Sequence, residues 1–184
     1  MAITRIGPNQ SINLASNITG TLPVANGGTA ITSGFINGTA TPGKVLQVVS
    51  ARPGVDVSTT STSFVATGTK LSITPSATSS KIWVMVTSGL FWANSTDAAA
   101  KGGGVTIYRA GSNLHGSTQM ARTYRIGATS IQTVASMSIL DSPSSTSSLE
   151  YEVFIKSIWG SATMQWNDAT NDMATITAME IAGW

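Results

Sequence analysis

Few side chains in this sequence could take part in catalysis. The single histidine, His115, stands in a stretch rich in Gly and Ser, and there are no cysteines. A histidine in such a loop is more typical of a surface than of a general base or a metal ligand. No serine stands in a G-x-S-x-G turn, so a Ser-His-Asp arrangement has no local support, although one assembled in space stays open. We therefore expect no enzymatic activity.

Two glutamates have a spacing that could serve hydrolysis. Glu150 and Glu152 lie two residues apart, which places both carboxylates on one face of a strand. Paired carboxylates cleave glycosidic bonds in many enzymes. Here the pair alternates with apolar residues and precedes Lys156. That pattern is more typical of a solvated strand face with a local ion pair.

Oxygen-bearing side chains gather near the C-terminal end. Asp168, Asn171 and Asp172 could ligate calcium, but their spacing fits no standard calcium loop. An ordinary turn, in which Asp and Asn are common, explains the presence of these three residues equally well. The glycine run at 102–104 lacks the Lys-Ser/Thr ending of a phosphate-binding loop. We predict no cofactor and no metal site, with calcium in the 168–172 loop as the open alternative.

Tryptophans are the remaining side chains with recognition chemistry. Trp83 and Trp166 fall within strand patterns, where core or interface packing is expected. Trp92 and Trp159 fall at predicted strand ends, where a loop surface could contact a glycan. We therefore treat Trp92 and Trp159 as candidate glycan contacts.

The element that must position these groups is best seen at residues 147–166. Apolar residues at alternate positions predict a strand with one wet side: Leu149, Tyr151, Val153 and Ile155. A break at 159–161 leads to a second alternating stretch, 162–166. Two strands joined by a short turn that contains glycine predict an antiparallel hairpin.

Similar strands recur along residues 44–184 at spacings of about 8–15 residues, and no stretch has the period of an amphipathic helix. The predicted strands cover 45–49, 55–58, 63–73 with a break at Gly68, 81–91, 105–109, 130–140 and 173–181. We expect 93–104 to be a loop and 110–113 a turn. The predicted fold is an all-β, antiparallel β-sandwich head, jelly-roll-like.

The strand at 81–91 is apolar on both faces. Only one face of a sandwich strand meets the opposing sheet, so the second face needs another cover. We predict that Trp83, Met85 and Phe154 lie at an interface between copies of the chain. Cover by one of the chain's own loops is the alternative.

Residues 1–43 differ from the rest, and we divide the chain into an extended docking arm (1–43) and a head (44–184). Arg5 is the only charged side chain in the arm, and frequent Gly and Pro exclude a long helix. The scattered apolar residues are too few for a core, so we expect them to be buried against sister chains, another protein, or both. The predicted docking residues are Ile12, Leu14, Ile18, Leu22, Pro23, Val24, Asn26, Gly27 and Gly28.

The charge content excludes several partners. Only 10% of residues are charged and the net charge is +2, without any run of Lys or Arg. Arg122, Tyr124 and Arg125 come nearest to a basic-aromatic cluster, which we interpret as strand-end surface charge, so we predict no nucleic-acid partner. No window is long and apolar enough to span a membrane, and no signal peptide is evident, so we expect synthesis in a cytoplasm without export by the usual route.

Two regions resemble bacteriophage virion surface proteins. The segment NITGTLPVANGGT (17–29) resembles one that precedes trimeric heads in tail-fibre proteins. The stretches TSTSFVATGTKLSITPSATSSKI (60–82), ILDSPSSTSSLEYEVFIKS (139–157) and ITAMEIAG (176–183) resemble C-terminal heads of tail fibres and capsid decoration proteins. The resemblance implies a jelly roll of the tumour-necrosis-factor type that assembles as a homotrimer.

We weigh two functions. The first is a capsid decoration, or cement, protein on the virion outer surface, whose trimer clamps the icosahedral shell through the major capsid protein and could also aid host attachment. The alternative is a short tail fibre or tailspike tip that binds a host-surface glycan. We favour decoration because the chain is short and has no long repetitive stalk.

Overall fold

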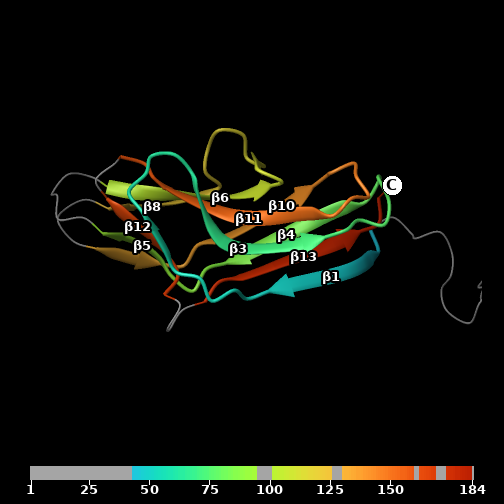
Figure 1. The fold of residues 1–184 in the computed structure, drawn as a ribbon, viewed down its shortest axis with the longest axis horizontal. Coiled ribbons are helices and arrows are strands. Elements are labelled where there is room, and N and C mark those ends of the chain that lie inside the picture. The colour runs from blue at the N-terminus through green and yellow to red at the C-terminus, as the bar shows by residue number, and fades with distance from the viewer. Residues whose placement is uncertain (1–42, 95–100, 126–129, 160–161, 169–172, 184) are drawn as a thin grey trace, which may run out of the picture. The chain divides into compact units, whose positions relative to one another are not determined.

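The computed structural model describes residues 43–94, 101–125, 130–159, 162–168 and 173–183. These residues form thirteen β-strands in antiparallel sheets and no helix (Figure 1). The prediction of an all-β antiparallel sandwich is confirmed. Within these ranges, no helix exists that could cross a bilayer. The nine predicted docking residues of the arm lie outside the described residues, so they stay predictions.

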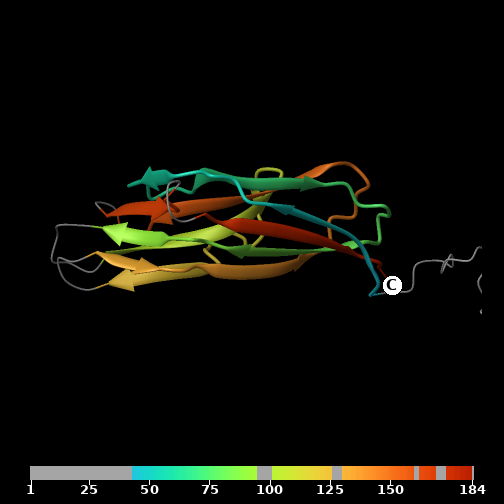
Figure 2. The same ribbon diagram turned by 90° about the horizontal axis from the view of Figure 1, so that it is seen from below.

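The strands belong to two long sheets and one short one. The first sheet has the order β1 (Val45–Ala51), β13 (Thr175–Ile181), β4 (Lys81–Thr87), β10 (Ser136–Asp141). The second has the order β3 (Val65–Ile73), β11 (Leu149–Ser157), β6 (Lys101–Arg109), with β7 (Ser112–Asn113) and β8 (Ala121–Arg125) both paired to β6. The short sheet has the order β2 (Val57–Thr59), β12 (Thr163–Trp166), β5 (Phe91–Asn94), β9 (Ile131–Thr133). Figures 1 and 2 show the long sheets as two layers, with β5 and β12 at the end away from the C-terminus.

The main strands pair in a nested order. The outermost strands along the chain, β1 and β13, are neighbours, and inside them β3 pairs with β11, β4 with β10, and β6 with β8. This is the pairing of one long antiparallel ribbon, and the ribbon is rolled so that successive pairs alternate between the two long sheets. The sandwich is therefore jelly-roll-like, an arrangement in which nearly every strand pair joins distant parts of the chain.

The core follows from the period-two alternation of the strands. On β4 the inward residues Ile82, Val84 and Val86 are buried. On β11 the predicted inward residues Tyr151, Val153 and Ile155 have no exposed area. Both sets belong to one apolar cluster between the layers, as expected where two sheets pack face to face. The prediction of which residues face inward on these strands is confirmed.

The predicted hairpin at 147–166 is wrong. Its two strands exist as β11 and β12, but they do not pair with each other: β11 pairs with β3 and β6, and β12 pairs with β2 and β5. The alternation in 149–155 and 162–166 reports which side chains are buried. It carries no information about which strand lies alongside, because long-range pairing satisfies the same pattern.

The predicted loop at 93–104 is wrong at both ends, and the predicted strand at 81–91 is two strands: β4 ends at Thr87, β5 extends to Asn94, and β6 begins at Lys101. Strand β6 begins four residues before its predicted start, and Gly102, Gly103 and Gly104 are buried inside it. A Cβ added to Gly103 would overlap the Met164 side chain, and one added to Gly104 would lie 2.8 Å from Gln119 Cβ. The glycines therefore allow neighbouring side chains to pack directly on the backbone, which local propensity does not reveal.

Two further predicted strands have different bounds. The 130–140 strand is interrupted, because β9 ends at Thr133 and β10 begins at Ser136. The break predicted at Gly68 is instead a bulge within the continuous strand β3, where Gly68 has a φ of 74° and the β3–β11 register shifts. A positive φ is readily adopted only by glycine, so Gly68 suits this position. Its N–H donates to Glu152 Oε1 at 3.0 Å.

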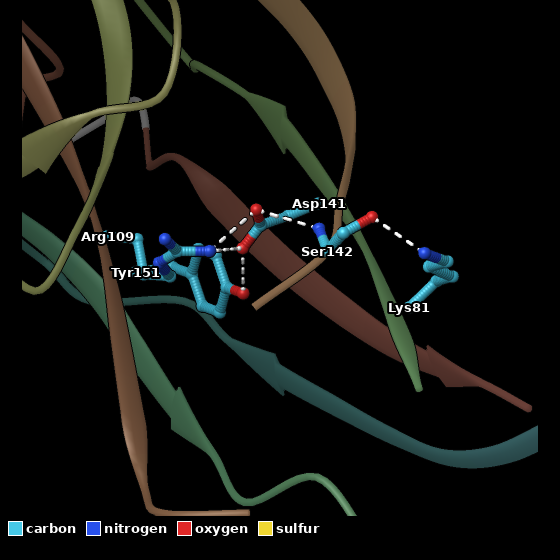
Figure 3. Close-up of polar contacts among 5 residues, drawn as sticks. All are labelled: Lys81, Arg109, Asp141, Ser142 and Tyr151. Carbon is cyan, nitrogen blue, oxygen red and sulfur yellow. Dashed lines mark hydrogen bonds and ion pairs between the residues drawn. The ribbon is translucent and has the colours of Figure 1, made fainter. Parts of the chain in front are cut away.

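A polar cluster ties the two layers together (Figure 3). Arg109 Nη1 of β6 contacts both carboxylate oxygens of Asp141 on β10 at 2.7 Å, and the Tyr151 hydroxyl of β11 donates to Asp141 Oδ2 at 2.6 Å. Burial, then the bond to Asp141, raises the pKa of Tyr151 well above its ordinary value, so the hydroxyl keeps its proton. The backbone N–H of Ser142 donates to Asp141 Oδ1, and Lys81 Nζ donates to Ser142 Oγ.

A second polar anchor is the Glu180 carboxylate, which is 1% exposed. Glu180 Oε1 accepts from the backbone N–H and hydroxyl of Ser76 and from the Ser80 hydroxyl, and Oε2 accepts from Gln47 Nε2 at 2.6 Å. These bonds hold the 74–80 loop against β13. A buried carboxylate is tolerated here because each oxygen has donors.

Candidate interaction surfaces

The residues screened for catalysis have structural partners or exposed positions. His115 is exposed, and its backbone N–H donates to Asn113 Oδ1 at 2.9 Å. Glu150 forms an ion pair with Lys70 of β3 at 3.0 Å, and the bond to Glu150 raises the pKa of Lys70. The local ion pair expected for this face thus involves Lys70, while the Lys156 ammonium lies 4.4 Å from the centre of the Phe64 ring.

The calcium alternative is only partly covered by the structure. Asp168 is described, but Asn171 and Asp172 lie outside the described residues. In the described ranges, no group of three or more His, Asp or Glu side chains is placed to hold a metal ion.

The outer face of the first sheet carries an apolar row that crosses all four strands. The register places Val48 beside Met179, Met179 beside Trp83, and Trp83 beside Leu140. Val48, Trp83 and Leu140 are 54%, 39% and 53% exposed. We call these four residues the apolar row. Large side chains that project together from one sheet face form a contiguous apolar surface, which is typical of an interaction site.

The surroundings of the apolar row are nearly uncharged. The next row of the register is Ser50, Thr177, Met85 and Ser138. A groove of about 260 Å³ runs beside it and is lined by Trp83, Met85, Thr87, Ser136 and Ser138, together with Val86 and Met137. Within these four strands, Lys81 at the start of β4 is the one charged residue on the outer face. The face can thus be covered without burying charge.

The structure brings Trp83 and Met85 together but separates them from Phe154. Phe154 lies on the outer face of the second sheet, on the far side of the sandwich from Trp83. Its ring stacks on Tyr108 with centroids 3.9 Å apart, and Phe64 packs edge-on against Tyr108 at 5.8 Å. The three residues predicted for one interface therefore belong to two different faces.

The two candidate glycan contacts also differ. Trp92 is half-buried in β5, and its indole Nε1 is enclosed with no hydrogen-bond partner among the described residues. Trp159 is 45% exposed and makes an edge-to-face contact with Tyr124, which is 46% exposed, at 5.3 Å between ring centroids. Only Trp159 presents a ring to solvent. Sequence reasoning missed Tyr124 as its companion, although the Arg122-Tyr124-Arg125 cluster contained the signal.

Comparison with known proteins adds no family. No protein-family model matches the chain, and no curated protein matches it.

Proposed function

We propose that this chain is a non-enzymatic structural protein of a bacteriophage virion, a homotrimeric decoration protein on the outer surface of the capsid. The sandwich packs against copies of itself, and residues 1–43 dock on the major capsid protein. The trimer clamps the icosahedral shell because three arms bind at once, so each arm raises the effective concentration of the others.

The observation that carries the proposal is the apolar row. Seven large hydrophobic side chains are exposed among the described residues, and four of them, Val45, Val48, Trp83 and Leu140, lie on the first sheet. Removing one half-exposed side chain of this size from water contributes on the order of 1 kcal/mol to the free energy of association. A trimer repeats that contribution at each of its contacts. Met85 and Trp83 are the predicted interface residues that this proposal retains.

The composition supports permanent assembly. Only 10% of residues are charged, whereas typical globular chains have about 25%. A polar but nearly neutral surface favours association over free solubility. The sequence of residues 1–43, with scattered apolar residues and one charged side chain, and the resemblance of segments 17–29 and 60–82 to virion surface proteins point in the same direction.

The test of location is copy number. Purified virions that contain this chain should be separated by gel electrophoresis, and its band should be compared with that of the major capsid protein. The proposal predicts hundreds of copies per particle, because a decoration protein covers the shell. A handful of copies per particle would place the chain at the tail and overturn the capsid role.

The second candidate function is a short tail fibre or tailspike tip that binds a receptor on the host surface. The exposed Trp159–Tyr124 pair favours this function, because exposed aromatic pairs are common recognition surfaces. Both candidates share the sandwich and the trimer. They differ in what residues 1–43 contact, which the copy number distinguishes.

A further inference from the structure

A second surface, on the opposite face from the apolar row, combines aromatic rings with cations. We define the aromatic–cationic patch as Trp159, Tyr124, Arg122 and Lys156, with Gln119 between them. The β6 register explains how these residues meet. Gly102 pairs with Tyr124, and Gly104 pairs with Arg122 on one side and with Lys156 on the other.

The glycines of β6 give the patch its shape. A Cβ added to Gly102 would lie 3.0 Å from the Trp159 ring, and one added to Gly104 would meet Gln119. Trp159 and Gln119 therefore lie across the bare backbone of β6, between the side chains of β8 and β11. The result is a shallow platform in which the Trp159 and Tyr124 rings stand next to each other and both reach solvent.

The charge of the platform has one sign. Its two ionisable groups besides Tyr124 are the Arg122 guanidinium and the Lys156 ammonium, and no carboxylate lies in these rows of the register. Within the described part of the chain, Arg122 has no ion-pair or side-chain hydrogen-bond partner. Lys156 lies over the Phe64 ring and holds its charge on the same face. The free donors of Arg122 suit a carboxylate, sulfate or phosphate group.

We propose that the aromatic–cationic patch binds an acidic saccharide. The apolar face of a sugar ring packs on the exposed Trp159–Tyr124 pair, and the acidic group of the sugar binds to Arg122 with Lys156 nearby. Gln119 supplies an amide for a sugar hydroxyl. The patch lies on the far side of the sandwich from the apolar row, so this binding is compatible with either candidate function and does not rest on the capsid role.

A single-stranded nucleic acid fits the patch less well. Such a strand needs several stacking platforms along a positively charged groove that follows the backbone. Here two rings form one edge-to-face pair, two cations flank it, and the net charge of the chain is only +2. One or two sugar rings match the extent of this surface better. Binding of a nucleic acid is therefore an outcome that the test must be able to detect.

Isothermal titration calorimetry on the full chain tests the proposal with matched probes. Trigalacturonate is compared with its methyl ester, and sialyllactose with lactose, so that each pair differs in the acidic group. Hexathymidylate is the nucleic-acid probe. The variants are Trp159→Ala, Trp159→Phe and Arg122→Gln. The controls are Val134→Ala, which shortens an exposed hydrophobic side chain outside both the apolar row and the patch, and Arg52→Gln, which removes an exposed arginine elsewhere.

At least one acidic saccharide should bind, about tenfold more tightly than its neutral match. Trp159→Ala and Arg122→Gln should each lower that affinity about tenfold, and Trp159→Phe should lose less because it keeps a ring. Val134→Ala and Arg52→Gln should leave that affinity unchanged. The proposal is overturned if neither acidic saccharide binds, if the neutral matches bind equally well, if the controls lose as much as the patch variants, or if hexathymidylate binds more tightly than both saccharides.

Discussion

Trp166 and Trp92 carry the same indole group in neighbouring strands, but only one indole is hydrogen-bonded. Trp166 Nε1 donates to Thr69 Oγ1 at 2.8 Å inside the sandwich, whereas the enclosed Trp92 Nε1 has no partner among the described residues. An unmade hydrogen bond in a buried place costs free energy, so the two residues should respond differently to the loss of the N–H.

Replacing each tryptophan by phenylalanine tests this difference. Trp166→Phe removes a hydrogen bond from a fully buried site and leaves the Thr69 hydroxyl without its donor, so the free energy of unfolding should fall by about 1–3 kcal/mol. Trp92→Phe removes an unsatisfied donor and should cost less than about 1 kcal/mol. Urea unfolding of both variants measures the contrast. Equal losses would show that the indole hydrogen bond does not matter.

The Glu180 carboxylate makes stability depend on pH. Burial alone would raise its pKa, but the hydrogen bonds from Ser76, Ser80 and Gln47 outweigh burial and hold the pKa below its ordinary value of 4.5. A lowered pKa in the folded state means that the contribution of Glu180 is present above pH 4.5 and is lost as pH falls below it.

Glu180→Gln should therefore lower the free energy of unfolding at pH 7 by about 2 kcal/mol, because hydrogen bonds to a charged group are lost. The difference between wild type and variant should shrink below pH 4.5. Glu150→Gln is the control, since its exposed ion pair with Lys70 should contribute less than about 1 kcal/mol. A difference that stays constant from pH 7 to pH 3 would contradict this role for Glu180.

At the scale of the elements, strand β6 depends on its glycines for packing. An added Cβ at Gly102 would overlap the Thr123 carbonyl oxygen of the paired strand β8, and backbone cannot move aside as a flexible side chain can. Gly111, in the turn after β6, has open space around it and a φ of 82°. Glycine is therefore needed at 102 because there is no space for a side chain, and at 111 because the backbone has a positive φ.

We expect Gly102→Ala to destabilise the chain by more than about 2 kcal/mol, because the β6–β8 pairing must shift. Gly111→Ala should cost about 1 kcal/mol, which is the cost of a positive φ for alanine. Thermal unfolding compares the two. If Gly111→Ala were the more damaging change, close packing against β6 would not be the reason for glycine at 102.

The sequence predicts burial on these strands better than it predicts their partners. The alternation at 149–155 identified Tyr151, Val153 and Ile155 as inward, because one face of a strand repeats every second residue. The sequence does not reveal the pairing partners of β11, because these are β3 and β6, whose residues lie far away along the chain. The glycine run has the composition of a loop, and its place in a strand depends on Met164, Gln119 and Trp159, which only the fold brings to β6.

The candidate surfaces were predictable to a similar extent. The double-sided apolar pattern of β4 correctly marked Trp83 and Met85 as residues outside the core, and the structure adds Val48, Met179 and Leu140 through the register. Phe154 is likewise an apolar residue on the outward face of its strand, but its ring stacks on Tyr108 on the outer face of the second sheet. Which face a strand turns outward is set by the whole sandwich, and no local pattern contains it.

At the scale of the whole molecule, the two outer faces of the sandwich have different chemistry. The first sheet shows the nearly uncharged apolar row, whereas the second shows the aromatic–cationic patch and the Lys70–Glu150 ion pair. An uncharged face is cheap to bury between copies, and a charged aromatic face is better suited to a soluble ligand. We therefore propose self-assembly through the first sheet and ligand recognition on the second.

Light scattering of the full chain after size-exclusion chromatography measures whether the apolar row mediates self-assembly. Leu140→Glu places a charge in the apolar row, while Val134→Glu changes an equally exposed hydrophobic residue outside it, 57% against 53%. We predict that wild type and Val134→Glu have three times the 18.9 kDa mass of one chain, and that Leu140→Glu has the mass of a single chain. A monomeric wild type, or a Leu140→Glu variant that keeps the wild-type mass, would contradict the assignment of the apolar row to self-assembly.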